Sequence, residues 1–141
     1  MKKILIVNSN YYKDISANLV FNTKKKLLSV KFKVSILDIP GAFEIPIAIR
    51  KNINDFDGFV ALGCVIRGQT PHFDLLCSSL FDAILNLSIK YNKPIGNGVI
   101  TALNLNQAKQ RSKKNNVSKP NKGSEAANAV ISILKNGPKK I

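Results

Sequence analysis

Four short apolar segments, each followed by a stretch with helical spacing, limit the folds open to this chain more than any other feature. Buried strands that alternate with helices pair in parallel through right-handed crossovers, and the helices cover both faces of the sheet. We therefore predict one domain over residues 1–141, an α/β fold of three layers (α/β/α) with a four-stranded parallel sheet. The predicted strands are Lys3–Asn8, Val30–Leu37, Gly58–Val65 and Ile95–Thr101.

The longest predicted helix is Phe73–Tyr91, because apolar residues recur along one face of it. That stripe consists of Phe73, Leu76, Leu80, Ile84 and Leu87. Phe43–Lys51 is also predicted to be helical, since Pro46 falls in its first turn, where proline is tolerated. The remaining helices are predicted at Ser16–Leu28, Asn104–Lys114 and Gly123–Leu134, with a basic loop that contains Pro120 between the last two.

The chain carries a formal net charge of +14, and the excess is greatest in residues 91–141. Such a charge can mark a nucleic-acid surface. The sequence has no basic motif interleaved with aromatic residues and no recognisable recognition helix, so we favour attraction of small anions over nucleic-acid binding. The run Lys24–Lys26 is interpreted as a solvated helix face.

Targeting signals and cysteine usage favour a cytoplasmic protein. No apolar run approaches the length of a membrane span, and the apolar start of the chain is too short for a signal peptide. Cys64 and Cys77 lack metal-ligand spacing and are expected to be reduced core residues.

Ligands of parallel α/β sheets bind beyond the carboxyl ends of the strands, and one segment there contains the only histidine of the chain. In Gly63–Asp74 an apolar strand end leads through a turn into a helix. We predict Thr70 as the N-cap, Pro71 at the first helical position and His72 next to it. A helix N-terminus attracts anions and disfavours protonation of a nearby imidazole.

A neutral histidine beside an anion-binding turn suits a proton carrier that acts on a phosphorylated substrate. A purely structural histidine is the alternative. At the neighbouring strand ends, Tyr11 could stack on a planar ring, and Glu44 reads by itself as a carboxylate that complements a helix dipole. The sequence contains no GxGxxG, Walker, HExxH or CxxC motif, so we predict no cofactor and no metal.

Two paired segments, Pro40–Pro46 (PGAFEIP) and Leu62–Asp74 (LGCVIRGQTPHFD), closely resemble lumazine synthases, the 6,7-dimethyl-8-ribityllumazine synthases of riboflavin biosynthesis. Later matches follow in order through Asn121–Gly123 and the last helix, so the resemblance spans nearly the whole chain. It implies a flavodoxin-like fold and a cofactor-free transferase. The family condenses 5-amino-6-(D-ribitylamino)uracil with 3,4-dihydroxy-2-butanone 4-phosphate, and it releases phosphate and water.

The resemblance also assigns roles by position. His72 matches the proton donor and acceptor of the family. The positions that match pyrimidine-binding ones are Tyr11, Ala42, Phe43, Glu44, Cys64, Val65, Ile66 and Asn97. The positions that match phosphate-binding ones are Gln69, Thr70, Arg111 and Lys122. Asn97 and Tyr11 depart from the family pattern, because many members have an aromatic residue at the first position and phenylalanine is more usual at the second.

In the family the active site lies between subunits of a ring of five, so the resemblance implies a homopentamer whose neighbouring subunit supplies Asn97, Arg111 and Lys122. Some members assemble rings into a 60-subunit shell; the high charge of this chain favours an isolated pentamer. Riboflavin synthase is the implied protein partner. The alternatives are a non-catalytic flavin- or lumazine-binding module of the same fold, a nucleic-acid-associated protein, and a riboflavin synthase activity that uses lumazine itself.

Overall fold

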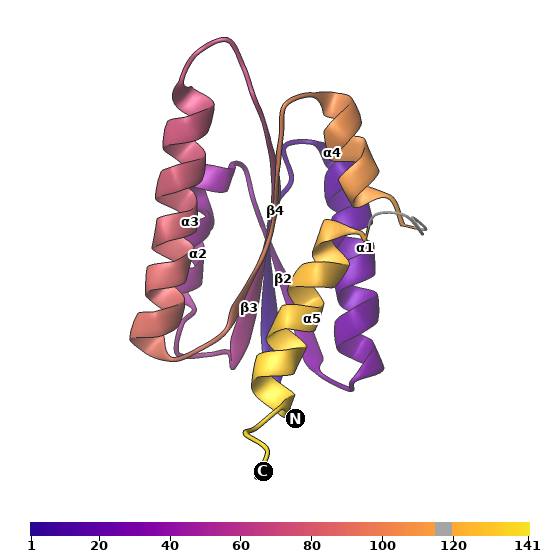
Figure 1. The fold of residues 1–141 in the computed structure, drawn as a ribbon, viewed down its shortest axis with the longest axis vertical. Helices are drawn as coiled ribbons and strands as arrows, with labels where there is room; N and C mark the ends of the chain where they lie inside the picture. Colours follow the sequence, from indigo (N-terminus) through magenta and orange to yellow (C-terminus); the bar gives the residue numbers. More distant parts are fainter. Residues whose placement is uncertain (115–119) are drawn as a thin grey trace.

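Four parallel strands form the centre of the protein, with helices on both sides (Figure 1). The computed structural model describes residues 1–114 and 120–141, so the middle of the predicted basic loop, residues 115–119, lies outside the described part. The strand order is β2-β1-β3-β4, and every neighbouring pair is parallel. This is the predicted three-layer arrangement, and it is flavodoxin-like.

The strands are the apolar segments that the sequence predicts, and their ends shift by a few residues. Because β1 and β3 lie between other strands and under helices, nearly all of their residues are buried. The strands are β1 (Lys3–Ser9), β2 (Lys33–Ile39), β3 (Gly58–Ile66) and β4 (Ile95–Ala102).

Two apolar cores lie on opposite faces of the sheet. On one face, α1 (Lys13–Ser29), α4 (Leu105–Ser112) and α5 (Lys122–Lys135) pack against the even-numbered side chains of β3. On the other face lie α2 (Ile45–Lys51) and α3 (His72–Tyr91). Figure 1 shows α3 and α5 on opposite sides of β4.

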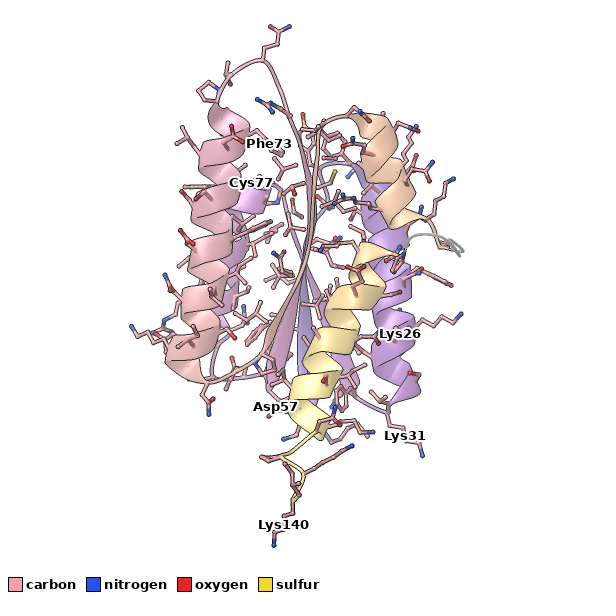
Figure 2. All side chains as sticks on the ribbon, in the orientation of Figure 1. Lys26, Lys31, Asp57, Phe73, Cys77 and Lys140 are labelled. Carbon is pink, nitrogen blue, oxygen red and sulfur yellow. The ribbon has the colours of Figure 1, made fainter. Side chains whose placement is uncertain are left out.

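The apolar stripe predicted for the longest helix is confirmed. Leu80 and Ile84 are buried against the sheet, and Phe73, Leu76 and Leu87 pack around them. Figure 2 shows Phe73 and Cys77 on the side of α3 that faces the sheet, whereas Lys26 extends from α1 into solvent.

Helix α3 corrects one expectation from the sequence. It is the one helix in the described part that is long and apolar enough to cross a membrane, with a mean hydropathy of 1.2 over eighteen residues. A single such helix is weak support for a membrane span, and here one face of the helix packs on the sheet. The outer face of α3 is nevertheless apolar, and it exposes Leu75, Leu85 and Ile89.

Three predicted boundaries were wrong for local reasons. β2 begins at Lys33 and not at Val30, because α1 runs to Ser29 and Lys31 adopts a left-handed conformation with φ of 64°. Helix α1 starts at Lys13, before the first predicted helical residue. A short 3₁₀ turn, η1 (Ala42–Glu44), precedes α2. The predicted helix from Phe43 is therefore divided into the end of this 3₁₀ turn and an α-helix.

The close backbone approach predicted at Gly96 and Gly98 is confirmed. A Cβ atom at Gly96 would lie within contact distance of the backbone oxygen of Ala126 in α5, and one at Gly98 would clash with Leu62. Because no side chains intervene, α5 packs directly on β4. This contact places the start of α5, with Lys122, beside the last strand.

Candidate active site

The strand β3 extends beyond its neighbour β1 at the carboxyl edge of the sheet. The β1–β3 ladder ends with Asn8 opposite Leu62, whereas the β3–β4 ladder continues to Ile66 opposite Ala102. Ser9 lies beside Gly63, and the following residues Cys64–Ile66 have no described strand on their β1 side. This opening lies between β1 and β3, where the strand order reverses, which is the usual position of ligands in such sheets.

A buried polar cluster fixes the segment that follows β1. The side chain of Ser16 donates to Oδ1 of Asn8 at 2.8 Å, and Nδ2 of Asn8 donates to Asp38 at 2.9 Å. Asn8 and Ser16 are each 5% exposed, and the sequence analysis did not identify them. The cluster joins β1, α1 and β2, so it fixes the end of β1 from which the next loop starts.

The predicted ring-stacking residue, Tyr11, lies in this loop and is exposed. Its ring meets that of Tyr12 edge-on, with 4.9 Å between the ring centroids and an interplanar angle of 77°. Because 73% of Tyr11 is accessible, its ring is available to a planar ligand. Burial raises the pKa of the neighbouring Tyr12 phenol above its ordinary value, and the thiol of Cys64 and the phenol of Tyr11 raise it further.

The turn η1 carries the predicted pyrimidine-binding residues Ala42, Phe43 and Glu44. Ala42 is buried and anchors the turn, while Phe43 is 74% exposed. The carboxylate of Glu44 folds back toward Gly41, where a Cβ atom would lie only 2.9 Å from Oε1. Phe43 and Glu44 line one end of an apolar cavity of about 430 Å³ between α2 and α3.

The open stretch of β3 contains Cys64, Val65 and Ile66. Their side chains pack against the two cores, Cys64 and Ile66 on one face and Val65 on the other, and Cys64 and Ile66 remain partly exposed. Burial raises the pKa of the Cys64 thiol to about 11, so this thiol is protonated at neutral pH. Burial raises the pKa of the Cys77 thiol as well, with a further contribution from Asp74. Both cysteines are free.

The turn from β3 to α3 presents Gln69, Thr70 and His72, all of them exposed. The predicted N-cap was wrong, because the capping position is Pro71 and no side chain caps the helix. His72 is therefore the first residue of α3. Pro71 has a ψ of 4°, outside the range of a regular α-helix, so the helix begins one residue later than predicted. The histidine still lies at a helix N-terminus at the carboxyl edge of the sheet.

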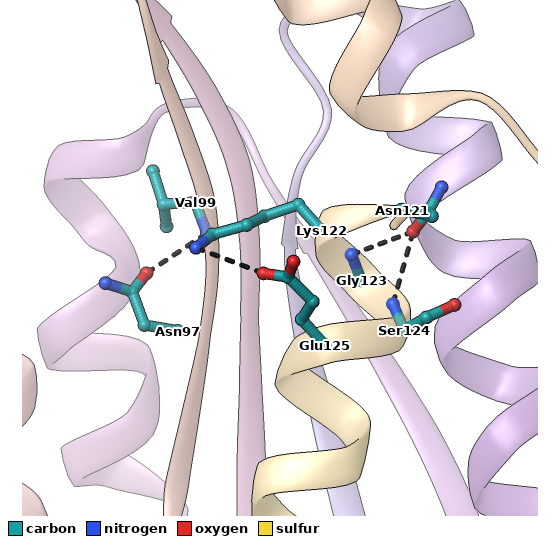
Figure 3. Close-up of polar contacts among 7 residues, drawn as sticks. All are labelled: Asn97, Val99, Asn121, Lys122, Gly123, Ser124 and Glu125. Atoms are coloured by element: carbon teal, nitrogen blue, oxygen red, sulfur yellow. Dashed lines mark hydrogen bonds and ion pairs between the residues drawn. The ribbon is translucent and has the colours of Figure 1, made fainter. Parts of the chain in front are cut away.

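Arg111 and Lys122 line a common small cavity of about 210 Å³, together with Pro120 and Glu125. Nζ of Lys122 lies 3.7 Å from a carboxylate oxygen of Glu125, one turn along α5 (Figure 3). Both side chains of this pair are partly exposed, so the pair contributes little to stability. The structure thus brings together the two predicted phosphate-binding cations, which are eleven positions apart in the sequence.

Asn97 lies on β4, the edge strand of the sheet. Its Oδ1 accepts a hydrogen bond from the backbone N–H of Val99 at 3.1 Å, as Figure 3 shows. Oδ1 of Asn97 is thus bonded to a backbone N–H group on the open edge of β4.

The predicted site residues fall into two groups within one chain. His72 begins a helix on the α2/α3 face, whereas Arg111 and Lys122 belong to helices on the α1 face (Figure 1). Because the sheet separates the two groups, a single chain does not gather all of the predicted residues into one cavity. The described residues also include no cluster of three or more His, Cys, Asp or Glu side chains that could hold a metal ion.

A wide apolar groove of the described structure holds none of the predicted site residues. It measures about 650 Å³ and lies between α1 and the edge strand β2, with an apolar floor that includes Val20, Leu28 and Ile36. Asp38 and lysines of α1 also line this groove, but no histidine does. The only histidine of the chain lies elsewhere, at the start of α3.

Comparison with known proteins gives a consistent result. Residues 1–136 match the family of 6,7-dimethyl-8-ribityllumazine synthase. The 6,7-dimethyl-8-ribityllumazine synthase of Methylorubrum populi is 38% identical over 139 residues, which cover 94% of this chain and 80% of the relative.

Two further relatives carry the same name. That of Afipia carboxidovorans is 36% identical over 140 residues, covering 94% of this chain and 84% of the relative. That of Agrobacterium fabrum is 36% identical over 138 residues, covering 93% and 91%. The match over nearly its whole length shows that this chain belongs to the 6,7-dimethyl-8-ribityllumazine synthase family.

Proposed function

We propose that the reaction of this family takes place in a site that two copies of the chain complete. The chain is a transferase of riboflavin biosynthesis, which condenses 5-amino-6-(D-ribitylamino)uracil with 3,4-dihydroxy-2-butanone 4-phosphate. One copy supplies the open stretch of β3 and His72. The neighbouring copy supplies Asn97, Arg111 and Lys122.

The open edge of β3 is the observation on which this proposal depends. A pyrimidine has donors and acceptors in its plane, and the unpaired backbone of Cys64–Ile66 can bond to them as a further strand would. The exposed ring of Tyr11 stacks on the heterocycle, and Ala42–Glu44 holds the ring and the ribityl chain. Side chains are not needed for these backbone contacts, which fits the packing of Cys64 and Val65 into the core.

The phosphate of the second substrate lies between the turn at Gln69 and Thr70 and the cations of the neighbouring copy. Backbone N–H groups at the start of α3 and the partial positive charge of the helix terminus attract the anion. The guanidinium of Arg111 can form two parallel hydrogen bonds to phosphate oxygens, whereas Lys122 acts as a point charge.

Once both substrates are held together, the only catalytic help that the reaction requires from side chains is the transfer of protons. The amine adds to the ketone, and loss of water gives an imine. Elimination then releases the phosphate, and ring closure with loss of a second water gives the lumazine. His72 takes and returns protons in these steps, and such catalysis contributes roughly 10² to 10⁴-fold. Holding the two reactants together supplies much of the remaining acceleration.

The outer face of α3 supports the association of several copies. Leu75, Leu85 and Ile89 are between 58% and 71% exposed, and Phe43 and Ile47 extend the apolar surface over α2. A patch of this kind marks a protein interface. We propose an isolated pentamer, because a charge of +14 on each chain opposes the assembly of many rings. Light scattering should give five times the chain mass of 15.5 kDa, or about 78 kDa. A monomer, or a particle of about a megadalton, would contradict this proposal.

A turnover assay tests the proposed function most simply. Purified chain is mixed with both substrates, and the absorbance and fluorescence of the lumazine are followed. We expect lumazine and phosphate in equal amounts, and each substrate alone gives no product. A folded protein that binds lumazine but forms none would instead be the binding module. Consumption of lumazine supplied alone would point to a riboflavin synthase activity.

Two further proposals concern the cellular setting. The free cysteines fit a reducing compartment, so we propose that the protein is cytoplasmic, and cell fractionation tests this. Because its product is the substrate of riboflavin synthase, we propose that enzyme as a partner. Absence of co-purification from cells that contain both proteins would contradict the partnership.

A further inference from the structure

The ends of the connection between α4 and α5 are held by one buried side chain, that of Asn121. Its Nδ2 donates to the backbone oxygen of Ser112 at 2.9 Å and to that of Lys113 at 3.3 Å. Asn121 is 4% exposed and Ser112 is 1% exposed, so the bond between them is buried. The bond to Ser112 fixes the last turn of α4, next to Arg111.

The same side chain also caps the next helix. Oδ1 of Asn121 accepts hydrogen bonds from the backbone N–H groups of Gly123 at 2.8 Å and of Ser124 at 3.2 Å (Figure 3). These bonds fix the first turn of α5, which begins with Lys122. The donor Nδ2 of this amide thus binds the end of α4, and the acceptor Oδ1 binds the start of α5.

The start of α5 is further locked against α1. A Cβ atom at Gly123 would lie only 2.6 Å from the backbone oxygen of Leu19, so no other residue fits there without displacement. The buried Asn22 on α1 donates to the backbone oxygen of Lys114 at 3.2 Å and to Ser124 at 3.3 Å. With α5 fixed in this way, the amide of Asn121 bonds the last turn of α4 directly to it, whereas Asn22 reaches only Lys114, beyond the end of α4.

We propose that Asn121 is a positioning residue for phosphate binding, because it holds Arg111 and Lys122 at a fixed separation across their common cavity. This inference rests on the proposed function, in which these two cations bind the substrate phosphate. Two cations on separate helices act on one anion only when their spacing matches it. A displacement of about 1 Å can cost as much as about 10²-fold in kcat/KM, and here the loss falls on KM because these cations bind the phosphate.

An ordinary N-cap would account for only half of the contacts of Asn121. Capping uses the acceptor Oδ1 alone, and serine performs it equally well. The donor Nδ2 is not required for the cap, yet it makes both bonds to the end of α4. The substitution Asn121→Ser therefore retains a cap and removes the link between the helices.

Asn52→Ser is the matched control. Nδ2 of Asn52 donates to the backbone oxygen of Ala48 at 2.8 Å, at the end of α2 and at the opposite edge of the sheet. The control removes the same kind of amide-to-carbonyl bond by the same substitution. Melting temperatures of both variants show whether a change in kinetics reflects only lost stability.

The experiment measures kcat, the KM of each substrate and competitive inhibition by inorganic phosphate. For Asn121→Ser we expect the KM of the phosphorylated substrate and the Ki of phosphate to rise about tenfold. The value of kcat at saturation and the KM of the pyrimidine should stay within about twofold, as should every parameter of Asn52→Ser. An unchanged KM, or an equal rise in both KM values, would overturn the proposal.

Arg111→Ala, measured in parallel, distinguishes a failure of the positioning role of Asn121 from a failure of the phosphate-binding role of Arg111. If it raises the KM of the phosphorylated substrate and Asn121→Ser does not, only the positioning role fails. If Arg111→Ala itself has no effect on that KM, the phosphate role fails, and the positioning role fails with it. Should Asn121→Ser not fold, Asn121→Asp retains the cap and places an acceptor against the two carbonyl oxygens. Its KM should remain raised at high salt, where the added charge is screened.

Discussion

Asn8 and Leu62 form the last pair of the ladder between β1 and β3, and beyond them β3 continues for four residues that pair with β4 alone. This one-sided stretch lies at the point where the strand order reverses, and the turn that leads to His72 follows it directly. A short difference in strand length thus creates the binding edge on which the proposed mechanism depends.

Replacement of His72 by alanine should leave a slow enzyme. Because we assign His72 to proton transfer alone, kcat should fall by roughly 10² to 10⁴-fold, while both substrates still bind. His72 is exposed, so the fold and the melting temperature should be unaffected. Stopped-flow and long-term lumazine assays cover this range. Complete loss of turnover in a folded, assembled variant would contradict the role given to proximity.

Replacement of Arg111 by alanine should weaken binding of the phosphorylated substrate. Loss of a charge-assisted contact costs about 1.5–3 kcal/mol, so the KM of this substrate should rise by roughly 10- to 100-fold. The KM of the pyrimidine should hardly change. Steady-state kinetics with each substrate varied in turn provides the measurement. A larger effect on the pyrimidine would show that the guanidinium lies elsewhere in the site.

Introduction of an aromatic ring at Asn97 should strengthen binding of the pyrimidine. The asparagine side chain is engaged by the N–H of Val99 on the edge strand, whereas phenylalanine would present a flat surface. Stacking of a base on an aromatic side chain contributes about 1–3 kcal/mol, so Asn97→Phe should lower the KM of the pyrimidine about fivefold or more. Asn97→Leu is the control for added apolar area. An equal effect of leucine would argue against stacking.

The thiol of Cys64 should react slowly in the folded protein. Its pKa of about 11 leaves about one thiolate in 10³ at pH 8. Iodoacetamide should therefore label Cys64 rapidly only after unfolding, as mass spectrometry of a Cys77→Ser variant can show. Equal labelling rates in folded and unfolded protein would exclude the buried environment.

The same pKa has a consequence for stability at alkaline pH. Because the folded state holds this proton more tightly than the unfolded chain, the contribution is complete below the ordinary thiol pKa of 9.0 and is lost as the pH rises to about 11. The free energy of unfolding should therefore fall more steeply over this interval in the original chain than in Cys64→Ala. Parallel curves would contradict the assignment.

Much of the fold follows from the sequence, because the apolar runs and the helical stripe of α3 leave few other arrangements. Gly96 and Gly98 likewise indicated the close packing of α5. The 3₁₀ turn at Ala42–Glu44 and the left-handed Lys31 were missed, because each depends on the backbone of a few residues and leaves no periodic signal. The start of α3 was misplaced by one residue for a similar reason.

The sequence selects candidate residues for the site, but it does not show how the site is built. The motifs around Glu44 and His72 identify positions, whereas the open edge of β3 depends on where β1 stops pairing. The role of Asn121 could not be found from the sequence beyond its capping preference, since its bonds to Ser112 join segments whose spacing only the fold determines. The sequence pattern likewise does not show that the sheet separates His72 from Arg111, because this follows from the fold.

The most direct test of the shared site is to mix two variants, each of which lacks one of the two site residues. His72→Ala and Arg111→Ala are purified separately, then dissociated and reassembled together at equal amounts. Activity is measured with the phosphorylated substrate well below its KM in Arg111→Ala, so that each variant alone is nearly inactive. If neighbouring copies supply these two residues, about one quarter of the mixed sites regain both, and activity should rise to about one quarter of the value of the original chain under the same conditions. Activity that stays at the mean of the two separate variants, in mixed assemblies verified by mass spectrometry, would contradict a site between copies.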